Sequence, residues 1–154
     1  MFRASEVFNF AIAIEKKGRT FYRAMAAAAK DDRARQLFQR LAQEEEQHVL
    51  DFARLAEGVG SYDPPESYPG EYDAYMEALV NSHVFSRDLD PEALAEEILS
   101  DKEALDLAIR FEKDSLLFFA GLRNLVSQTE VRFIDELLRQ ERRHLCELHS
   151  LLNA

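Results

Sequence analysis

Apolar residues recur at steps of three and four along four long segments of this chain. This spacing is the period of an α-helix that buries one face. We predict that Ser5 caps the first helix and that Gly58 ends the second. All four prolines lie between the second and third segments, so the long helices lack the residue that most strongly breaks them. The predicted helices span residues 5–29, 32–57, 101–125 and 130–152.

Each apolar face contains acidic or imidazole side chains at one level. The second and fourth segments carry Glu-x-x-His, and the first and third each carry a lone Glu after an Ala-Ile pair. The six residues concerned are Glu15, Glu45, His48, Glu112, Glu141 and His144. The other inward positions are Phe8, Ala11, Ile14, Gly18, Phe21, Tyr22 and Met25; Leu37, Leu41, Phe52 and Leu55; Leu105, Ala108, Leu116, Phe119 and Leu122; and Ile134, Leu137, Leu148 and Leu151.

These six residues predict a metal site. A buried carboxylate without a partner is strongly destabilising, so four of them in one core require compensating cations. Two divalent ions cancel four carboxylates, and two neutral imidazoles complete the set of ligands. One Glu from each of two helices and Glu-x-x-His from each of two others is the ligand set of a carboxylate-bridged dinuclear site in a four-helix bundle.

Two alternatives compete with this prediction. A single Glu-x-x-His is weak evidence, because Glu44, Glu45 and Glu46 are adjacent and one of them would satisfy almost any register. The acidic and imidazole groups could instead form buried ion pairs. Alternatively, the opposite face of each helix could be the buried one, so that these groups would face solvent. Lys and Arg are absent from the predicted faces, which argues against internal ion pairs.

The connections predict how the helices are joined. The first and third breaks are short, so each flanking pair of helices is expected to form an antiparallel hairpin. Residues 58–100 form a long crossover, with short helices expected at 71–80 and at 91–99, where Pro91 takes the first position. Residues around Glu15 and Glu112, and the two Glu-x-x-His motifs, repeat at nearly the same offset. We therefore expect one domain, residues 1–154, with pseudo-twofold symmetry.

Composition narrows the class of protein. A net charge of −10 argues against a nucleic-acid partner or an anionic membrane surface. No segment approaches the roughly 20 apolar residues that span a bilayer, and the N-terminus lacks a signal-peptide layout. Cys146 is the single cysteine, so no disulfide can form within the chain. These features predict a cytoplasmic protein.

A few residues outside the six have expected positions. Tyr22 lies two turns beyond Glu15 and is a candidate catalytic residue. Its phenol would either lie near the metals as a hydrogen-bond donor or redox neighbour, or pack in the core with a satisfied hydroxyl. We expect His83 at the surface of the crossover and His149 facing solvent or a partner. Cys146 is expected to be a packing residue, and residues 62–75, with four tyrosines, a packed or interface-covering connector.

The residues quoted above resemble the rubrerythrin family of the ferritin-like superfamily of di-iron carboxylate proteins. The resemblance implies an all-α, ferritin-like four-helix bundle of two antiparallel hairpins joined by a long crossover with short extra helices. It also implies two iron ions, which manganese or zinc can replace. Glu15 and Glu112 then correspond to terminal carboxylates and Glu45 and Glu141 to the bridging pair. His48 and His144 would each serve one iron.

The chain departs from the family pattern at two points. Rubrerythrins have a further Glu three residues after the ligand in the third long helix, and here that position is Ser115. Many also carry a rubredoxin module with four cysteines, which this sequence lacks, so electrons are expected from a separate donor protein. The resemblance implies a homodimeric oxidoreductase that reduces peroxide or dioxygen. Iron handling by ferroxidation and a metal-stabilised interaction domain are the alternatives.

Overall fold

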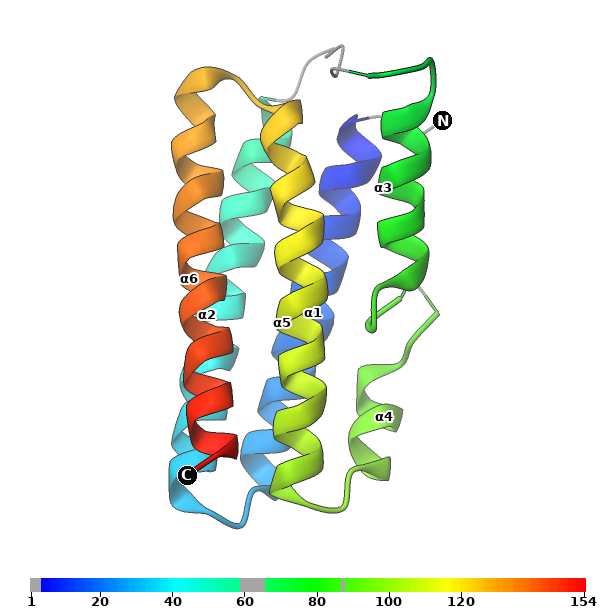
Figure 1. The fold of residues 1–154 in the computed structure, drawn as a ribbon. Coiled ribbons are helices and arrows are strands. Elements are labelled where there is room, and N and C mark those ends of the chain that lie inside the picture. Colours follow the sequence, from blue (N-terminus) through cyan, green and yellow to red (C-terminus); the bar gives the residue numbers. More distant parts are fainter. Residues whose placement is uncertain (1–3, 59–65, 87) are drawn as a thin grey trace.

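A computed structural model of the chain describes residues 4–58, 66–86 and 88–154 and shows a bundle of four long helices (Figure 1). These helices are α1 (Ala4–Ala28), α2 (Asp32–Glu57), α5 (Asp101–Leu122) and α6 (Gln128–Leu152). α1 and α2 form one antiparallel hairpin, and α5 and α6 form the other. Within the described residues, no helix has an apolar stretch long enough to cross a membrane.

Side-chain caps and glycine set the helix ends close to the predicted ones. Asp31 and Ser100 accept backbone N–H groups at the starts of α2 and α5, and Gly58 ends α2 as predicted. Ser127 and Glu130 form a capping box, so α6 begins two residues earlier than expected. The helix α1 already includes Ala4, so Ser5 lies inside the helix and the prediction that it caps α1 is wrong.

The third long helix ends earlier than its apolar pattern predicts. α5 stops at Leu122, and Arg123–Leu125 form a 3₁₀ turn rather than a last α-helical turn. Leu125 is nevertheless buried. The apolar spacing therefore continues through the turn although the hydrogen bonding tightens, which is common at helix C-termini.

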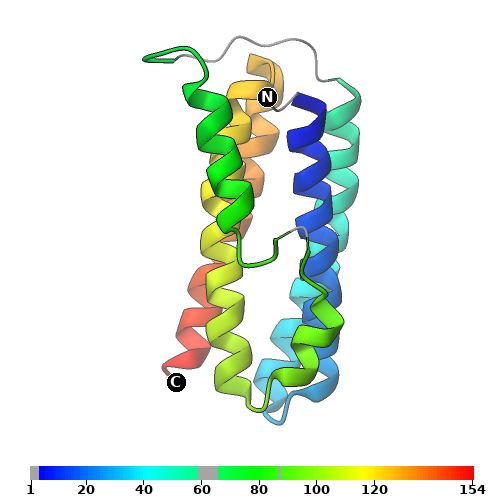
Figure 2. The ribbon, with the colours of Figure 1, turned by 90° about the vertical axis from the view of Figure 1, so that its right-hand side faces the viewer.

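The crossover returns the chain along the length of the bundle, because α2 and α5 run in the same direction (Figure 1). It contains α3 (Glu71–Ser82), which packs on α5, and α4 (Pro91–Glu97), which packs on α1 (Figure 2). Both short helices were predicted. Tyr72 donates a hydrogen bond from its hydroxyl to the Gly121 carbonyl at 2.8 Å, whereas Tyr68 and Tyr75 are exposed.

The core consists of two apolar clusters on either side of one polar layer. One cluster is built around Phe21, Leu41 and Phe111 and lies toward the α1–α2 turn. The other is built around Phe8 and Ile134 and lies toward the α5–α6 turn. The predicted inward positions are buried except Leu116 and Leu151, which are half-buried. Tyr62 lies outside the described residues.

Candidate metal centre

The polar layer between the two clusters contains the six predicted residues, and each of them is fully buried. Their ligand atoms form two overlapping groups, in each of which the atoms lie within 4.8 Å of one another. The first group is Glu15, Glu45, His48 and Glu141. The second group is Glu45, Glu112, Glu141 and His144. Glu45 and Glu141 belong to both, as bridging carboxylates would.

Both imidazoles point Nδ1 into the cluster. His48 Nδ1 lies 2.9 Å from Glu141 Oε1 and 3.3 Å from Glu15 Oε2. His144 Nδ1 lies 3.3 Å from Glu112 Oε1. The two rings are stacked with centroids 5.9 Å apart. Each imidazole therefore presents one nitrogen to one of the two groups.

The outward nitrogen of each imidazole is held by the facing helix. His48 Nε2 lies 2.8 Å from Gln140 Oε1, and His144 Nε2 contacts a carboxylate oxygen of Glu44. An oxygen partner at Nε2 fixes the proton there and leaves the Nδ1 lone pair for a metal. Sequence reasoning missed these two partners. The available signal was that each directly precedes the Glu of a Glu-x-x-His motif.

Tyr22 is packed in the core and is also hydrogen-bonded to one of the predicted ligands, and its catalytic role stays a prediction. Its side chain is fully buried in the core beside Phe38 and Phe111. Its hydroxyl donates a hydrogen bond of 2.7 Å to Glu112 Oε1. Burial raises the pKa of the phenol well above its ordinary value, and the charge of Glu112 adds to this effect. Tyr22 is therefore a permanent donor to a predicted ligand.

Burial dominates the ionisation of the clustered carboxyl groups. It raises the pKa of Glu45 above its ordinary value. Burial and the negative charges of Glu112 and Glu45 raise the pKa of Glu141 well above the usual range. Burial also acts to raise the pKa of Glu112, but interactions with Glu141, His144 and Tyr22 outweigh it and lower that pKa. Four carboxylates at this spacing cannot all ionise without cations among them.

The carboxylates act in the opposite direction on the imidazoles. Burial alone would lower the pKa of His48, but Glu141 and Glu45 raise it well above its ordinary value. Burial is likewise outweighed at His144, where Glu112 makes the main contribution that raises the pKa to about 9. A metal ion at Nδ1 would take the place of the proton that the carboxylates attract.

The donor set fits two divalent cations. Each of the four carboxylates has at least one buried oxygen without a hydrogen-bond partner. The ring nitrogen Nδ1 of His144 is also buried without such a partner. Among the residues whose burial the structure describes, none of the fully buried ones is Lys or Arg. Buried polar atoms normally have partners, so these atoms are oriented toward a missing one. Metal binding by the six residues nevertheless stays a prediction.

His83 is buried, so its predicted place at the surface is wrong. The residue is 3% exposed, and its ring packs against Phe85 and Phe111. The Phe85 N–H donates to Nδ1 at 2.9 Å, and Nε2 lies 3.2 Å from the Ser115 hydroxyl. The crossover turns inward after α3, and both ring nitrogens are paired, which makes burial of this polar residue tolerable.

The single cysteine also differs from expectation. Cys146 is exposed, so its assignment as a packing residue is wrong. It lies two positions after His144, which corresponds to about 200° around the helix and places it on the outer face of α6. His149 is exposed, as predicted.

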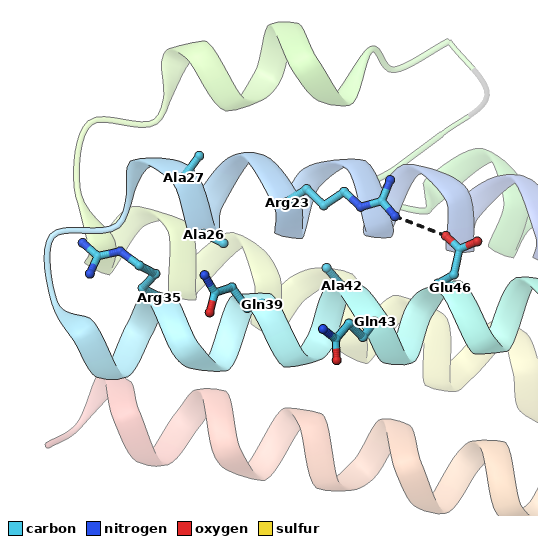
Figure 3. Close-up of a pocket in the computed structure, with 8 residues that line it drawn as sticks. All are labelled: Arg23, Ala26, Ala27, Arg35, Gln39, Ala42, Gln43 and Glu46. Carbon is cyan, nitrogen blue, oxygen red and sulfur yellow. Dashed lines mark hydrogen bonds and ion pairs between the residues drawn. The ribbon is translucent and has the colours of Figure 1, made fainter.

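A groove on the outer side of the α1–α2 hairpin is a separate feature (Figure 3). It has a volume of about 790 Å³ and is lined by residues that include Arg23, Gln39 and Glu46. Arg23 Nη2 lies 3.4 Å from Glu46 Oε2 at one side of the groove. None of the six clustered residues lines it, so it does not belong to the candidate metal centre.

Two hairpins, a long crossover and a buried Glu/His cluster define a class: helical-bundle proteins with a candidate di-metal carboxylate site. The Rubrerythrin family model matches residues 6–152, and the chain belongs to this family. A crystal structure from Thermotoga maritima, named as that of a ferritin-like diiron-carboxylate protein, matches with a TM-score of 0.77 and 24% identity. The match covers 99% of this chain and 95% of the other. It confirms the ferritin-like fold. No curated protein sequence matches the chain.

Proposed function

We propose that this protein is a non-haem di-iron oxidoreductase that reduces peroxide or dioxygen with electrons from a separate donor protein. The observation that carries the proposal is the buried double group of ligands that shares Glu45 and Glu141. Membership of the Rubrerythrin family supports it, as does the name of the structural neighbour. Iron is the metal of this proposal, and manganese or zinc would fit the same oxygen and nitrogen donors.

The burial of the cluster favours a small oxidant. All six side chains are inaccessible to solvent, and Phe52 and Phe119 pack with ring centroids 4.8 Å apart in the adjoining apolar cluster. Hydrogen peroxide and dioxygen are small enough to reach such a site through transient openings of the bundle. A bulky organic substrate would require a permanent cleft at the six residues.

The chain's own residues would hold and orient the metals. Glu44 and Gln140 keep each Nε2 paired, so each Nδ1 lone pair faces inward. Tyr22 occupies Oε1 of Glu112 and leaves Oε2 for a metal. When bound, a pair of ferrous ions would supply the two electrons that cleavage of an O–O bond requires. The apolar clusters on both sides exclude bulk water from this reaction.

One observation favours iron handling as a second candidate. Ser115, which stands where the family has its additional Glu, is buried and interacts with His83. The cluster therefore lacks the extra carboxylate at this position. A protein that only oxidises and stores iron requires a closed shell of many chains, whereas the reductase is expected to be a dimer. Analytical ultracentrifugation of the iron-loaded protein separates these two expectations.

Anaerobic peroxide titration tests the main proposal. The protein is loaded with two ferrous ions per chain and mixed with hydrogen peroxide in a stopped-flow spectrometer. We expect fast oxidation that consumes one peroxide per iron pair, because two ferrous ions supply two electrons and two protons complete the water formed. Re-reduction should restore the reaction for further cycles. Ferrous iron that remains inert to peroxide and dioxygen would overturn the proposal.

A further inference from the structure

The two imidazoles of the candidate centre have outer partners of different charge. His48 faces the neutral amide oxygen of Gln140, whereas His144 faces the carboxylate of Glu44. Both contacts cross from one long helix to the other, and both outer residues directly precede a predicted bridging Glu. The internal repeat therefore places an amide and a carboxylate in equivalent positions.

The carboxylate is held in place from its outer side. Arg143 Nη2 lies 3.1 Å from Glu44 Oε1, and Arg40 Nη1 lies 3.8 Å from the same oxygen. The other Glu44 oxygen faces His144. A carboxylate behind a metal-binding imidazole raises its strength as a ligand more than a neutral amide does. The Gln140 amide is itself oriented by donation from Nε2 to Glu136 Oε1 at 3.2 Å.

The two predicted terminal carboxylates, Glu112 and Glu15, also differ in how firmly an outer group holds them. Glu112 is anchored by the Tyr22 hydroxyl at Oε1, and its Oε2 is buried without a hydrogen-bond partner. Glu15 has no such anchor at Oε1, and its Oε2 lies 3.3 Å from His48 Nδ1. One terminal ligand is thus oriented by an outer group before any metal binds, and the other is not.

We propose that the two halves of the centre bind metal unequally. The His144 half-site (Glu112 and His144, with the shared Glu45 and Glu141) takes the first divalent ion, and it binds that ion more tightly. The His48 half-site (Glu15 and His48, with the same shared pair) takes the second. Glu44 is the positioning residue that makes the larger part of the difference, and the Tyr22 anchor on Glu112 adds the smaller part. This inference rests on the dinuclear site of the proposed function but not on peroxide turnover.

Histidine NMR with zinc tests the order of loading. Metal-free protein labelled with ¹⁵N at histidine is titrated with Zn²⁺, and the ring nitrogens are followed in long-range ¹H–¹⁵N spectra assigned with single-histidine variants. We expect the His144 signals to change up to one equivalent of zinc. The His48 signals should change between one and two equivalents. Repulsion between two cations would separate the two steps but would not choose which ring responds first.

Exchange of the outer partners identifies the cause. Glu44→Gln gives both imidazoles an amide, and we expect it to weaken the first step about 10- to 100-fold in chelator competition. The His144 and His48 signals should then respond at nearly the same zinc concentration, because only the Tyr22 anchor still distinguishes the two half-sites. Gln140→Glu gives both a carboxylate and should strengthen loading at His48. Glu147→Gln is the matched control, because Glu147 contacts Arg40 and Arg143 on the same face but does not contact either imidazole through any described hydrogen bond.

The outcomes separate the two proposals. If both rings respond in parallel in the wild type, or if His48 responds first, the inequality is overturned while the dinuclear site stands. A Glu44→Gln protein that keeps its native far-UV circular dichroism and the full wild-type separation between the two loading steps overturns the role of Glu44. If zinc and ferrous iron both fail to reach two ions per chain, the dinuclear site fails, and the proposed function fails with it.

Discussion

The α1–α2 and α5–α6 hairpins supply the same ligand types at matching positions, yet their surroundings differ. Each hairpin gives one lone Glu and one Glu-x-x-His to the buried cluster. Around these ligands, Glu44 in the first hairpin corresponds to Gln140 in the second, and Tyr22 corresponds to Phe119. The internal repeat therefore includes the types of ligand but not the residues that touch them.

The residue one turn after each lone Glu shows the same contrast. In α1 this is Gly18, where an added Cβ would lie 2.5 Å from Phe111 Cζ, so α1 approaches α5 closely there. In α5 it is Ser115, whose hydroxyl contacts His83 from the crossover. The crossover covers the side of the bundle that α1 and α5 form, with α4 on α1 and α3 on α5 (Figure 2), so each hairpin packs against a different part of the crossover.

Within the candidate site, the six ligands are more constrained than the groups behind them. Charge balance and the geometry of two cations would fix the four carboxylates and two imidazoles. The groups behind them need only satisfy hydrogen bonds, and these groups have diverged between the halves. Differences in reactivity between the two metal positions should therefore originate in the outer groups, because the ligand types are the same.

The largest expected effect comes from removing a shared ligand rather than one that belongs to a single half. Glu45→Ala should leave close to no bound metal, because both four-residue groups contain Glu45. His48→Ala should leave about one ion per chain, because His48 belongs to one group only. Metal analysis of zinc-loaded protein after desalting measures the difference.

The mirror-related variants are the controls for this experiment. Glu141→Ala should behave like Glu45→Ala, and His144→Ala should also leave about one ion, although more weakly bound than in His48→Ala. Equal metal loss in Glu45→Ala and His48→Ala would show that the assignment of shared and single ligands is wrong.

An effect of intermediate size on the pH dependence of stability is expected from the buried His83, which contacts Ser115 in α5. Burial lowers its pKa to about 4, Lys17 reinforces the shift, and Glu112 opposes it. The unfolded chain, with an ordinary pKa near 6.5, takes up the proton first. Stability is therefore lost as pH falls from about 6.5 to about 4, by at most about 3 kcal/mol. Urea unfolding with chelator present, between pH 7 and pH 4.5, measures this loss.

The variant His83→Gln isolates that contribution. Glutamine can accept from the Phe85 N–H and donate to Ser115, but it does not titrate. The free energy of unfolding of His83→Gln should fall less steeply than that of the wild type over this pH range, because the clustered carboxylates titrate in both proteins. His149→Gln, at an exposed histidine, should follow the wild type. Parallel curves for wild type and His83→Gln would contradict the prediction.

The fold was largely predictable because its signals are repeated along the chain. Helical spacing of apolar residues continues over many turns, and the prolines lie outside the long helices, so α2 was predicted to the residue. The helix ends that were predicted wrongly are determined by local hydrogen bonding. Ser127 and Glu130 start α6 early, and the Arg123–Leu125 turn keeps the apolar spacing of α5 after its α-helical bonding ends.

The candidate ligands were predictable for a similar reason, but their surroundings were not. An acidic residue within an apolar face is rare enough to be noticed, and here it occurs in all four long helices. Glu44 and Gln140 are ordinary polar residues in sequence, and their contacts depend on the register between α2 and α6. His83 lies in a connection without periodicity, so its burial depended on how the crossover folds back.

The smallest expected effect comes from the phenol that distinguishes the halves. Tyr22→Phe makes position 22 equivalent to Phe119 and removes the hydrogen bond to Glu112 Oε1. A hydrogen bond to a charged group contributes about 2 kcal/mol, so zinc-loaded Tyr22→Phe should be less stable by about that amount in urea unfolding. Loss of the anchor should also weaken zinc at the His144 half-site but leave the His48 half-site unchanged.

Tyr72→Phe separates the two consequences of that change. It removes a phenol hydrogen bond of similar length, to the Gly121 carbonyl, outside the metal cluster. We expect it to lower stability by about 1 kcal/mol, because the acceptor is neutral, and to leave zinc binding at both half-sites as in the wild type. If Tyr22→Phe lowers the free energy of unfolding but leaves zinc binding at both half-sites unchanged, the phenol contributes only to the stability of the core. The inequality of the two half-sites must then come from Glu44 and Gln140.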